Sequence, residues 1–263
     1  MAGKWVSGGG RKLAIPANTI IGVPFEAPAL QSLLAERPPD AVQADEALNL
    51  RVFKIRAADS AGRRSSASIL INRMYATRGY QTKPLSDEPE PNRITLMAVD
   101  HDVTIGTISI GFDVPGETLL VDEMFHAEVE PLRATGLKLC EFTKLAVDNV
   151  ARSKRVLASL FHVAFIYAHR IRGYDSLLIE VNPRHVRYYE RLLGSKVLGA
   201  ERMNPRVDAP AVLLQLDFAY VQAQIALFGG RADLSASKSS LYPYAFSISE
   251  EAGIVGRMVA AQG

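Results

Sequence analysis

Residues 140–194 constrain the fold more than any other part of the sequence. They read as an apolar strand, a basic turn, a long amphipathic helix, a second apolar strand and a further helix. Strands and helices that alternate with loops this short are typical of α/β domains. We therefore expect a mainly parallel α/β sheet here. The same stretch puts a carboxylate, Glu141, on a strand next to a cluster of cations at the start of a helix.

Hydrophobic periodicity predicts the remaining elements. Apolar residues at alternate positions indicate strands, and apolar residues three and four apart indicate helices. We expect a hairpin that turns at 100–102, and an almost wholly apolar, central strand at 176–181. The predicted strands span residues 48–55, 94–99, 104–113, 137–148, 176–181 and 211–217. The predicted helices span residues 66–78, a short stretch around 122–125, 154–172 and 184–193.

The chain is long enough for one substantial core, because 48% of its 263 residues are apolar. We expect a proline-rich, irregular N-terminal arm over 1–47 and one domain over 48–228. A Ser- and Gly-rich C-terminal tail with a short helix is expected over 229–263. Residues 247–250 (SISE) fit a capping box at the start of that helix.

Composition limits the partners and the compartment. A formal net charge of +2 gives no whole-chain reason to expect nucleic-acid binding. The single cysteine, Cys140, excludes an internal disulfide and suits a reducing compartment. The sequence lacks a run of about 18 apolar residues and a signal-peptide core. It also lacks metal-ligand spacing of His, Cys, Asp and Glu. We expect a soluble, cytoplasmic protein without a metal.

Three strings then point to a known family. Residues 141–148 (EFTKLAVD), 181–194 (VNPRHVRYYERLLG) and 210–218 (PAVLLQLDF) occur in this order, after 106–110 (GTISI). Over roughly residues 48–225, the chain resembles the FeeM-like N-acyl amino acid synthases. These enzymes are relatives of acyl-homoserine lactone synthases in the GCN5-related N-acyltransferase (GNAT) superfamily.

The resemblance implies a fold and a reaction. The fold is an α/β, GNAT-like sheet with parallel and antiparallel strands, flanked by helices. The reaction moves a long-chain acyl group from acyl carrier protein to the amine of an amino acid, giving an N-acyl amino acid.

The turn after the central strand bears on the acyl donor. Coenzyme A acetyltransferases of this fold usually wrap the pyrophosphate in a Gly-rich turn, whereas residues 148–155 contain no glycine. A phosphopantetheine arm carries one phosphate diester, which Arg152, Lys154 or Arg155 could pair with at the helix start. These cations would also steer the acidic carrier protein. We expect its phosphopantetheine as the donor group, and no permanently bound cofactor.

The resemblance also implies a binding edge for the pantetheine. In this fold the central strand splays from the next strand. The exposed N–H and C=O groups of Leu145, Ala146 and Val147 would then pair with the pantetheine amides.

Amide formation from a thioester needs an amine without its extra proton, donors for the oxyanion, and a proton for the leaving thiolate. We predict Glu141 as the general base, acting directly or through a water. The alternative is a salt bridge with Lys144 or Arg133. By resemblance, Tyr189 stands where related acyltransferases hold a tyrosine that protonates the thiolate. The alternatives are a packing role for Tyr189, or Tyr188 in its place.

The acceptor site is assigned by resemblance to the end of the first predicted helix. Arg73, with Tyr75 beside it, could clamp the carboxylate of the amino acid, and Arg133 is an alternative clamp. For both arginines an ordinary ion pair is the competing interpretation. Asp122 and Glu123 are further candidates for recognition of the ammonium group.

Three other functions stay open. An acyl-homoserine lactone synthase would need N-terminal tryptophans, and the only Trp of the chain is Trp5. An acyl-coenzyme A N-acyltransferase is disfavoured by the glycine-free turn. A non-catalytic module that binds carrier protein or nucleic acid through the basic cluster would consume no thioester, and its nucleic-acid version would bind with steep salt dependence.

Overall fold

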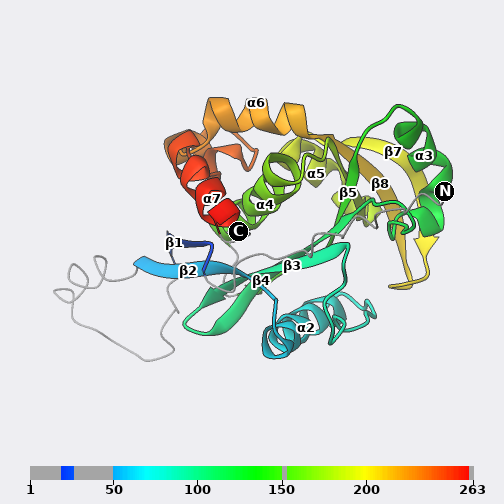
Figure 1. The fold of residues 1–263 in the computed structure, drawn as a ribbon, viewed down its shortest axis with the longest axis horizontal. Helices are drawn as coiled ribbons and strands as arrows, with labels where there is room; N and C mark the ends of the chain where they lie inside the picture. Colours follow the sequence, from blue (N-terminus) through cyan, green and yellow to red (C-terminus); the bar gives the residue numbers. More distant parts are fainter. Residues whose placement is uncertain (1–18, 27–49, 150–152, 261–263) are drawn as a thin grey trace, which may run out of the picture.

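The computed structural model describes residues 19–26, 50–149 and 153–260 (Figure 1). Its strands form one eight-stranded sheet in the order β1-β2-β3-β4-β5-β6-β8-β7. The strands are β1 (Ile21–Glu26), β2 (Leu50–Ala57), β3 (Arg93–Asp100), β4 (Val103–Phe112), β5 (Leu139–Val147), β6 (Ser176–Val181), β7 (Lys196–Asn204) and β8 (Ala209–Asp217). β1 lies in the segment predicted as an irregular arm, of which residues 1–18 and 27–47 are outside the described ranges.

The expectation of a mainly parallel sheet is wrong. β5 and β6 pair in parallel, and every other neighbouring pair in the described sheet is antiparallel. Only the β5–β6 connection passes over the sheet as a helical crossover between neighbours. After β6, the chain runs to the sheet edge as β7 and returns as β8 between β6 and β7. The mixed sheet that the resemblance implied is confirmed.

Each helix predicted from the sequence is present, although the bounds of several differ from the prediction. The helices are α2 (Ala61–Ala76), α3 (Asp122–Ala134), α4 (Lys154–Phe165), α5 (Val186–Leu193), α6 (Phe218–Phe228) and α7 (Ile248–Ala260). α4 runs into a π-helical turn, η4 (Ile166–Ile171), and α5 follows a short 3₁₀ turn, η5 (Pro183–His185). α3 is longer than the short helix expected there, and β7 and α6 were not predicted.

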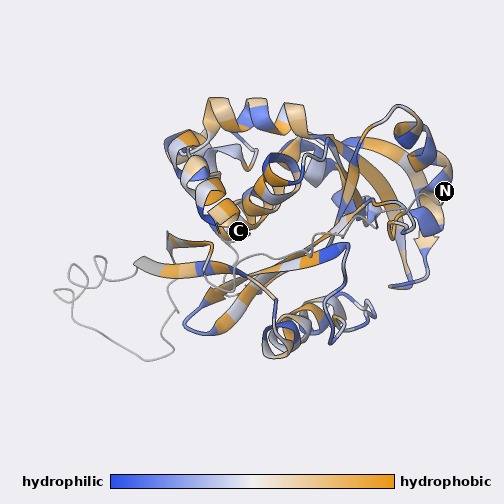
Figure 2. Cartoon of the chain, in the orientation of Figure 1, coloured by the Kyte–Doolittle hydropathy of each residue, from blue (hydrophilic) through white to orange (hydrophobic). Residues whose placement is uncertain are grey.

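One face of the sheet carries the main core. In Figure 1, α4 and α7 lie on one side of β3 and β4, and α2 lies on the other. Along β6, Leu177 and Ile179 point into the main core, whereas Leu178 belongs to a separate cluster with α3. Nine of the twelve residues of α4 are buried, and Figure 2 shows this helix as largely hydrophobic. The main core is therefore continuous under α4.

The opposite face is covered at two places rather than along its length. Met97 and Val99 of β3 pack with α2, and Leu139 and Leu178 pack with α3. Between these two apolar clusters the sheet presents polar side chains. This gap in the apolar cover positions the site described below.

The segment predicted as a tail belongs to the core. Phe246, Ile254 and Met258 are buried in the main apolar cluster. The predicted capping box at the start of α7 is confirmed, because the backbone N–H of Ser247 donates to Glu250 at 2.8 Å and the Ser247 hydroxyl accepts from the Glu250 N–H at 3.4 Å. The C-terminal segment thus seals one side of the domain.

Candidate active site

β5 and β6 part in the middle of the sheet. Their pairing runs from Leu139 with Ser176 to Glu141 with Leu178, and stops there. β5 nevertheless continues to Val147, still paired with β4, and β6 continues to Val181. The splay expected at Leu145, Ala146 and Val147 is therefore present. Backbone groups on this free edge are available to an extended ligand, as at the edge of any sheet.

A β-bulge contributes to the separation. Thr107 pairs with Ala146 and Ser109 with Thr143, so β5 has one residue more than β4 over this stretch. The extra residue is accommodated at Lys144, whose φ is 50° and whose carbonyl accepts a hydrogen bond from the Thr107 hydroxyl at 2.9 Å. Because bulges bend the strand that carries them, this one turns β5 away from β6.

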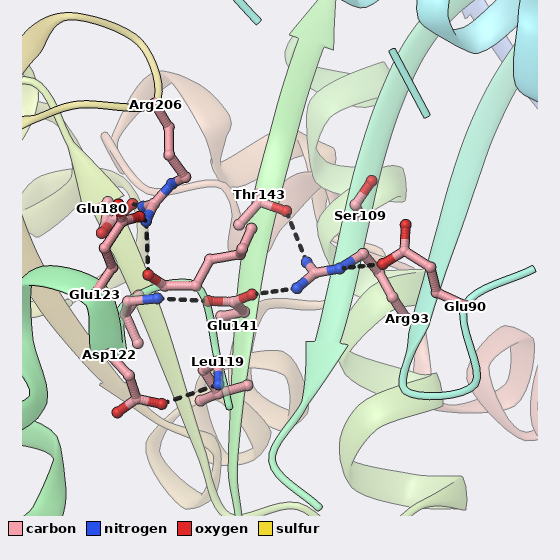
Figure 3. A network of polar contacts seen from close by, with 12 residues as sticks. Glu90, Arg93, Ser109, Leu119, Asp122, Glu123, Glu141, Thr143, Glu180 and Arg206 are labelled. Carbon is pink, nitrogen blue, oxygen red and sulfur yellow. Dashed lines mark hydrogen bonds and ion pairs between the residues drawn. The ribbon is translucent and has the colours of Figure 1, made fainter. Parts of the chain in front are cut away.

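A network of polar side chains, which we call the polar stripe, crosses the sheet face between α2 and α3 (Figure 3). Arg93 on β3 lies toward the α2 side of the stripe. Its Nη2 lies 2.7 Å from Glu141 Oε1, its Nη1 donates to the Thr143 hydroxyl at 3.3 Å, and its Nε donates to Glu90 at 3.2 Å. The stripe comprises Arg93, Glu141, Thr143, Glu180 and Arg206, with Glu90 and Glu123 at its two ends.

Glu141 is wholly enclosed, with an exposed fraction of 0%. Its second oxygen accepts the backbone N–H of Val121 at 3.1 Å. The salt bridge considered in the sequence analysis exists, although its cation is Arg93 rather than Lys144 or Arg133. The catalytic role of Glu141 stays a prediction.

A second carboxylate, Glu180 on β6, lies just past the last β5–β6 pair. Its Oε2 accepts a hydrogen bond from Asn204 Nδ2 at 3.0 Å and pairs with Arg206. Arg206 also pairs with Glu123 and donates to the Leu120 carbonyl at 2.7 Å. Burial raises the pKa of Glu180, Arg206 lowers it, and the charges of Glu141 and Glu123 raise it further. The sequence analysis missed Glu180, Arg93 and Arg206.

Tyr189 lies on α5 at the other side of the opening. Burial, together with Tyr75 and Tyr188 nearby, raises its pKa above the ordinary value. Tyr188, its rival in the sequence analysis, is 46% exposed. Across the opening, Arg184 donates to the Tyr80 hydroxyl at 3.2 Å, so the C-terminal end of α2 meets the start of α5.

Tyr75, predicted to bind the acceptor, belongs to the same corner. Its ring lies edge-on to Tyr80, with centroids 6.2 Å apart. Burial raises the pKa of Tyr75 to about 12, and the charge of Glu180 adds to the increase. Tyr75 is therefore within electrostatic reach of both Glu180 and Tyr189.

The two predicted arginine clamps already have carboxylate partners. Arg73 is 56% exposed and pairs with Asp148 in the loop after β5. Arg133 on α3 bridges two carboxylates, with Nε 2.7 Å from Asp113 and Nη1 2.7 Å from Asp122. These are the ion pairs that the sequence analysis held as the competing interpretation. Arg133 ties the C-terminal end of α3 to the end of β4.

The basic cluster is held by the C-terminal segment. Arg155 donates to the Tyr244 carbonyl at 2.7 Å and lies 5.6 Å from the Phe246 ring centroid. Lys154 lies over the Tyr244 ring at 5.7 Å and is exposed. Arg152 falls outside the described residues.

An apolar cavity lies on the main-core face of the sheet, beside the opening. It is small, with about 30 Å³ of open space between α4, α6 and the segment before α7. Phe142 and Leu177, from β5 and β6 next to their last pair, contribute to its wall. The other large aromatic residues of the lining are Phe161, Phe165, Phe218 and Tyr242.

Two further observations concern the described part of the chain. Within residues 19–26, 50–149 and 153–260, no cluster of three or more His, Cys, Asp and Glu side chains has the arrangement of a metal site. Of the helices formed by these residues, none is both long and apolar enough to span a bilayer.

Comparisons with known proteins agree with this geometry. The solved structure of FeeM, an N-acyl amino acid synthase from uncultured soil microbes, is 28% identical, with a TM-score of 0.59 over 66% of this chain and 95% of FeeM. An N-acetyltransferase from Staphylococcus aureus Mu50 is 14% identical, with a TM-score of 0.45 over 64% of this chain and 98% of its own. The acyl-homoserine lactone synthase LasI is 10% identical, with a TM-score of 0.47 over 63% and 89%. None of the curated proteins matches the chain.

The family model described as "N-acyl amino acid synthase FeeM" matches residues 66–217, more than half of the chain. The matched range contains the whole polar stripe, the opening between β5 and β6, and Tyr189. The predicted GNAT-like fold is confirmed. The chain therefore belongs to the FeeM family of N-acyl amino acid synthases, N-acyltransferases that make N-acyl amino acids.

Proposed function

We propose that the protein transfers a long-chain acyl group from acyl carrier protein to the amine of an amino acid. One observation carries the proposal. The opening between β5 and β6 has the polar stripe on one face of the sheet and the apolar cavity on the other. A thioester held in the opening would present its carbonyl to the polar face, and its hydrocarbon tail to the apolar one.

The lining of the cavity suits an acyl chain, and its walls would have to part to admit a long one, because the open space is about 30 Å³. Its lining is made of apolar and aromatic side chains apart from His162, which is fully engaged in hydrogen bonds. Each buried methylene contributes about 0.8 kcal/mol, so a chain of several carbons in such a site would gain affinity that an acetyl group cannot.

Carrier protein is the proposed donor because of the turn after β5. The free backbone edge of β5 can pair with the amides of a phosphopantetheine arm, and the exposed Lys154 stands at the start of α4 near the end of that edge. The turn lacks the glycines of a pyrophosphate-binding loop. Cys140 is buried and unpaired, which fits the reducing cytoplasm, where we place the reaction.

Proton transfer is assigned to the polar stripe and α5. Glu141 is the base that the sequence favours, and Glu180 is a second carboxylate on the same face. Like any tyrosine, Tyr189 is protonated at neutral pH and holds a proton that a leaving thiolate could take. Burial raises its pKa and makes the phenol a weaker acid, so its contribution to a developing thiolate would be mainly a donated hydrogen bond.

The acceptor would enter on the polar face, between α2 and α3. Tyr75 lines this approach, and the amino group would meet the carboxylates of the stripe. For Arg73 or Arg133 to bind the amino acid carboxylate, the substrate would have to displace Asp148, or Asp113 and Asp122. Tyr75 is therefore the acceptor-binding residue that the geometry favours among the three.

An assay with purified protein and a mixture of the twenty amino acids would test the proposal. The donors to compare are acyl carrier protein loaded with C12–C16 chains and the matching acyl-coenzyme A thioesters. We expect mass spectrometry to detect N-acyl amino acids, formed faster from the carrier-protein donor. Faster turnover of acyl-coenzyme A would make acyl-coenzyme A the proposed donor in place of acyl carrier protein. Thioester consumption without an N-acyl amino acid would reject the amino acid as acceptor, and no consumption would reject the enzyme activity.

A further inference from the structure

We infer that Glu180, rather than Glu141, is the group that takes the proton from the acceptor's ammonium. This inference rests on the function proposed above and assigns the base of that same site.

The first argument is an unused oxygen. Glu180 Oε1 is buried and has no hydrogen-bond partner in the described chain, and it is the only carboxylate oxygen there of which this is true. The side chain as a whole is 10% exposed. A buried carboxylate oxygen without a donor is unfavourable, so folded proteins rarely retain one without a functional reason. An ammonium N–H of the acceptor is the kind of donor that this oxygen would accept.

The second argument is the way the other oxygen is held. Glu180 Oε2 accepts from Asn204 and pairs with Arg206, and Arg206 is itself fixed by Glu123 and the Leu120 carbonyl. This arrangement anchors one oxygen and leaves the other directed away from the anchor. A base held in this way keeps its orientation while its free oxygen binds and releases a proton.

The third argument is the contrast with Glu141. Both oxygens of Glu141 have donors, from Arg93 at 2.7 Å and from the Val121 N–H at 3.1 Å, and none of the residue is exposed. Glu141 belongs to the last β5–β6 pair, opposite Leu178, whereas Glu180 lies two residues beyond that pair. Glu141 therefore contributes a fixed negative charge beside Glu180 and is a positioning residue.

The charged and titratable groups around Glu180 come from each element that packs on it. They are Glu141 on β5, Glu123 on α3, Arg206 in the β7–β8 loop and Tyr75 on α2. Burial and the two negative neighbours raise the pKa of Glu180, and Arg206 lowers it. Such a balance suits a group that has to gain and lose a proton in each cycle.

The proposed steps balance. The ammonium N–H gives its proton to Glu180 Oε1, which leaves a neutral amine. The amine nitrogen attacks the thioester carbonyl carbon, the C–N bond forms and the C–S bond breaks. The second nitrogen proton passes to the leaving thiolate by way of the Tyr189 hydroxyl, which gives the pantetheine thiol, and Glu180 returns its proton to solvent.

The test compares Glu180→Gln with Glu141→Gln, and uses Glu201→Gln, an exposed carboxylate on β7, as the matched control. For Glu180→Gln we expect a loss of about 10²–10⁴-fold in kcat/KM at pH 7. The loss should shrink by about tenfold for each pH unit as pH rises toward the pKa of the amine, because free amine then replaces the missing base. Glu141→Gln should keep the pH plateau, with its acidic limb shifted to lower pH.

Two results for a folded Glu180→Gln enzyme would overturn the inference. One is a wild-type rate, and the other is a loss that is equal at every pH, as a structural role would give. If this variant does not fold, Glu180→Asp replaces it. Because aspartate retracts the oxygen by one methylene, kcat should fall while the plateau persists, and a wild-type kcat would contradict the inference.

The two levels of the proposal fail differently. Absence of an N-acyl amino acid with the wild-type enzyme, whatever the donor, would reject the proposed function, and the role of Glu180 would fall with it. Formation of the product by the wild type, with either overturning result in the variant, would reject the role of Glu180 alone.

Discussion

Arg93 and Glu141 form a buried ion pair between β3 and β5, with Nη2 and Oε1 2.7 Å apart. The two side chains are 9% and 0% exposed, and 48 residues separate them in the chain. The pair closes the polar stripe on the side of α2 and places a negative charge beside Glu180. Both the stability of the sheet and the reaction should therefore depend on it.

Removal of one partner of the Arg93–Glu141 ion pair should lower the free energy of unfolding. Arg93→Met leaves Glu141 buried without its cation, and breaking a buried pair in this way costs about 3–5 kcal/mol. We expect the double variant Arg93→Met/Glu141→Leu to recover part of that loss in urea unfolding. Arg73→Met, which removes an exposed pair, should cost under about 1 kcal/mol. Equal losses for Arg93→Met and Arg73→Met would contradict the importance of the buried pair.

Gly111 should tolerate no side chain, because Glu141 lies against it. A Cβ at this position would come within 2.8 Å of Glu141 Oε1 and 3.0 Å of Arg93 Nη1. We expect Gly111→Ala to destabilise the fold by about 1–3 kcal/mol and to lower kcat, since the carboxylate has to move. Gly62→Ala, where a Cβ meets nothing within 4 Å, is the control for stability and rate. An unaltered kcat in Gly111→Ala would show that the position of Glu141 is unimportant for the reaction.

Partial filling of the cavity should shorten the preferred acyl chain. Ala158 on α4 lines the cavity and is buried. Ala158→Leu fills the small open space and adds bulk to the wall that would have to part for a long chain, and each methylene that is then excluded forfeits about 0.8 kcal/mol. In a mixture of C8 to C16 donors we expect mass spectrometry to show a shift toward shorter products. Ala226→Leu, an exposed position on α6, should leave the distribution unchanged. An unshifted distribution in Ala158→Leu would place the acyl chain elsewhere.

Local patterns predicted most elements of this fold. The apolar residues of 94–99 and 104–113, on either side of the polar turn 100–102, located the β3–β4 hairpin, whose strands are mostly buried and whose turn has positive φ at His101 and Asp102. β7 was missed, since Val197 and Glu201 are both exposed and its register with β8 shifts twice. α6 was missed although Phe218, Val221 and Ile225 have helical spacing and are buried. That signal was available in the sequence.

The parallel sheet was the wrong conclusion because strand order in space is not a local property. Nothing within 196–217 indicates that β8 inserts between β6 and β7. The site shows the same limit. Glu141 was found because it lies in a recognisable string, while its partner Arg93 comes from a distant strand. Glu180 could have been singled out as the one acidic residue in the apolar run 176–181, whereas its partner Arg206 could not.

Acid should loosen the attachment of α7. The Phe246 N–H donates to His162 Nδ1 at 2.9 Å, so the ring proton is on Nε2, which faces Glu251 at 3.0 Å. Burial lowers the pKa of His162 below 6.5. Glu251 also has a lowered pKa, because His162 and Arg170 outweigh its burial.

The sign is the same for both groups. Below pH 6.5 the unfolded chain takes up a proton at His162 that the folded chain does not. The free energy of unfolding therefore decreases as the pH decreases. The contribution of Glu251 is present above its unfolded pKa of 4.5 and is lost as pH falls through the lower folded value. We expect the free energy of unfolding to decrease between pH 7 and pH 4, and less steeply in His162→Gln. Identical slopes for both proteins would exclude His162 as a source of the pH dependence.

Lys154 should act on the carrier protein rather than on the chemistry. It is exposed at the start of α4, where an acidic carrier protein could approach, and lies over the Tyr244 ring. We expect Lys154→Glu to raise KM for acyl carrier protein by about tenfold at low salt, with the difference reduced near 0.5 M salt by screening. The KM for a small acyl-pantetheine thioester should stay the same, and so should kcat with either donor.

Lys196→Glu, an exposed cation at the start of β7, makes the same charge change at another place on the surface. Equal effects of the two substitutions would indicate attraction by net charge alone, and an effect of Lys154→Glu on the small donor would indicate that the lysine contacts the pantetheine arm itself.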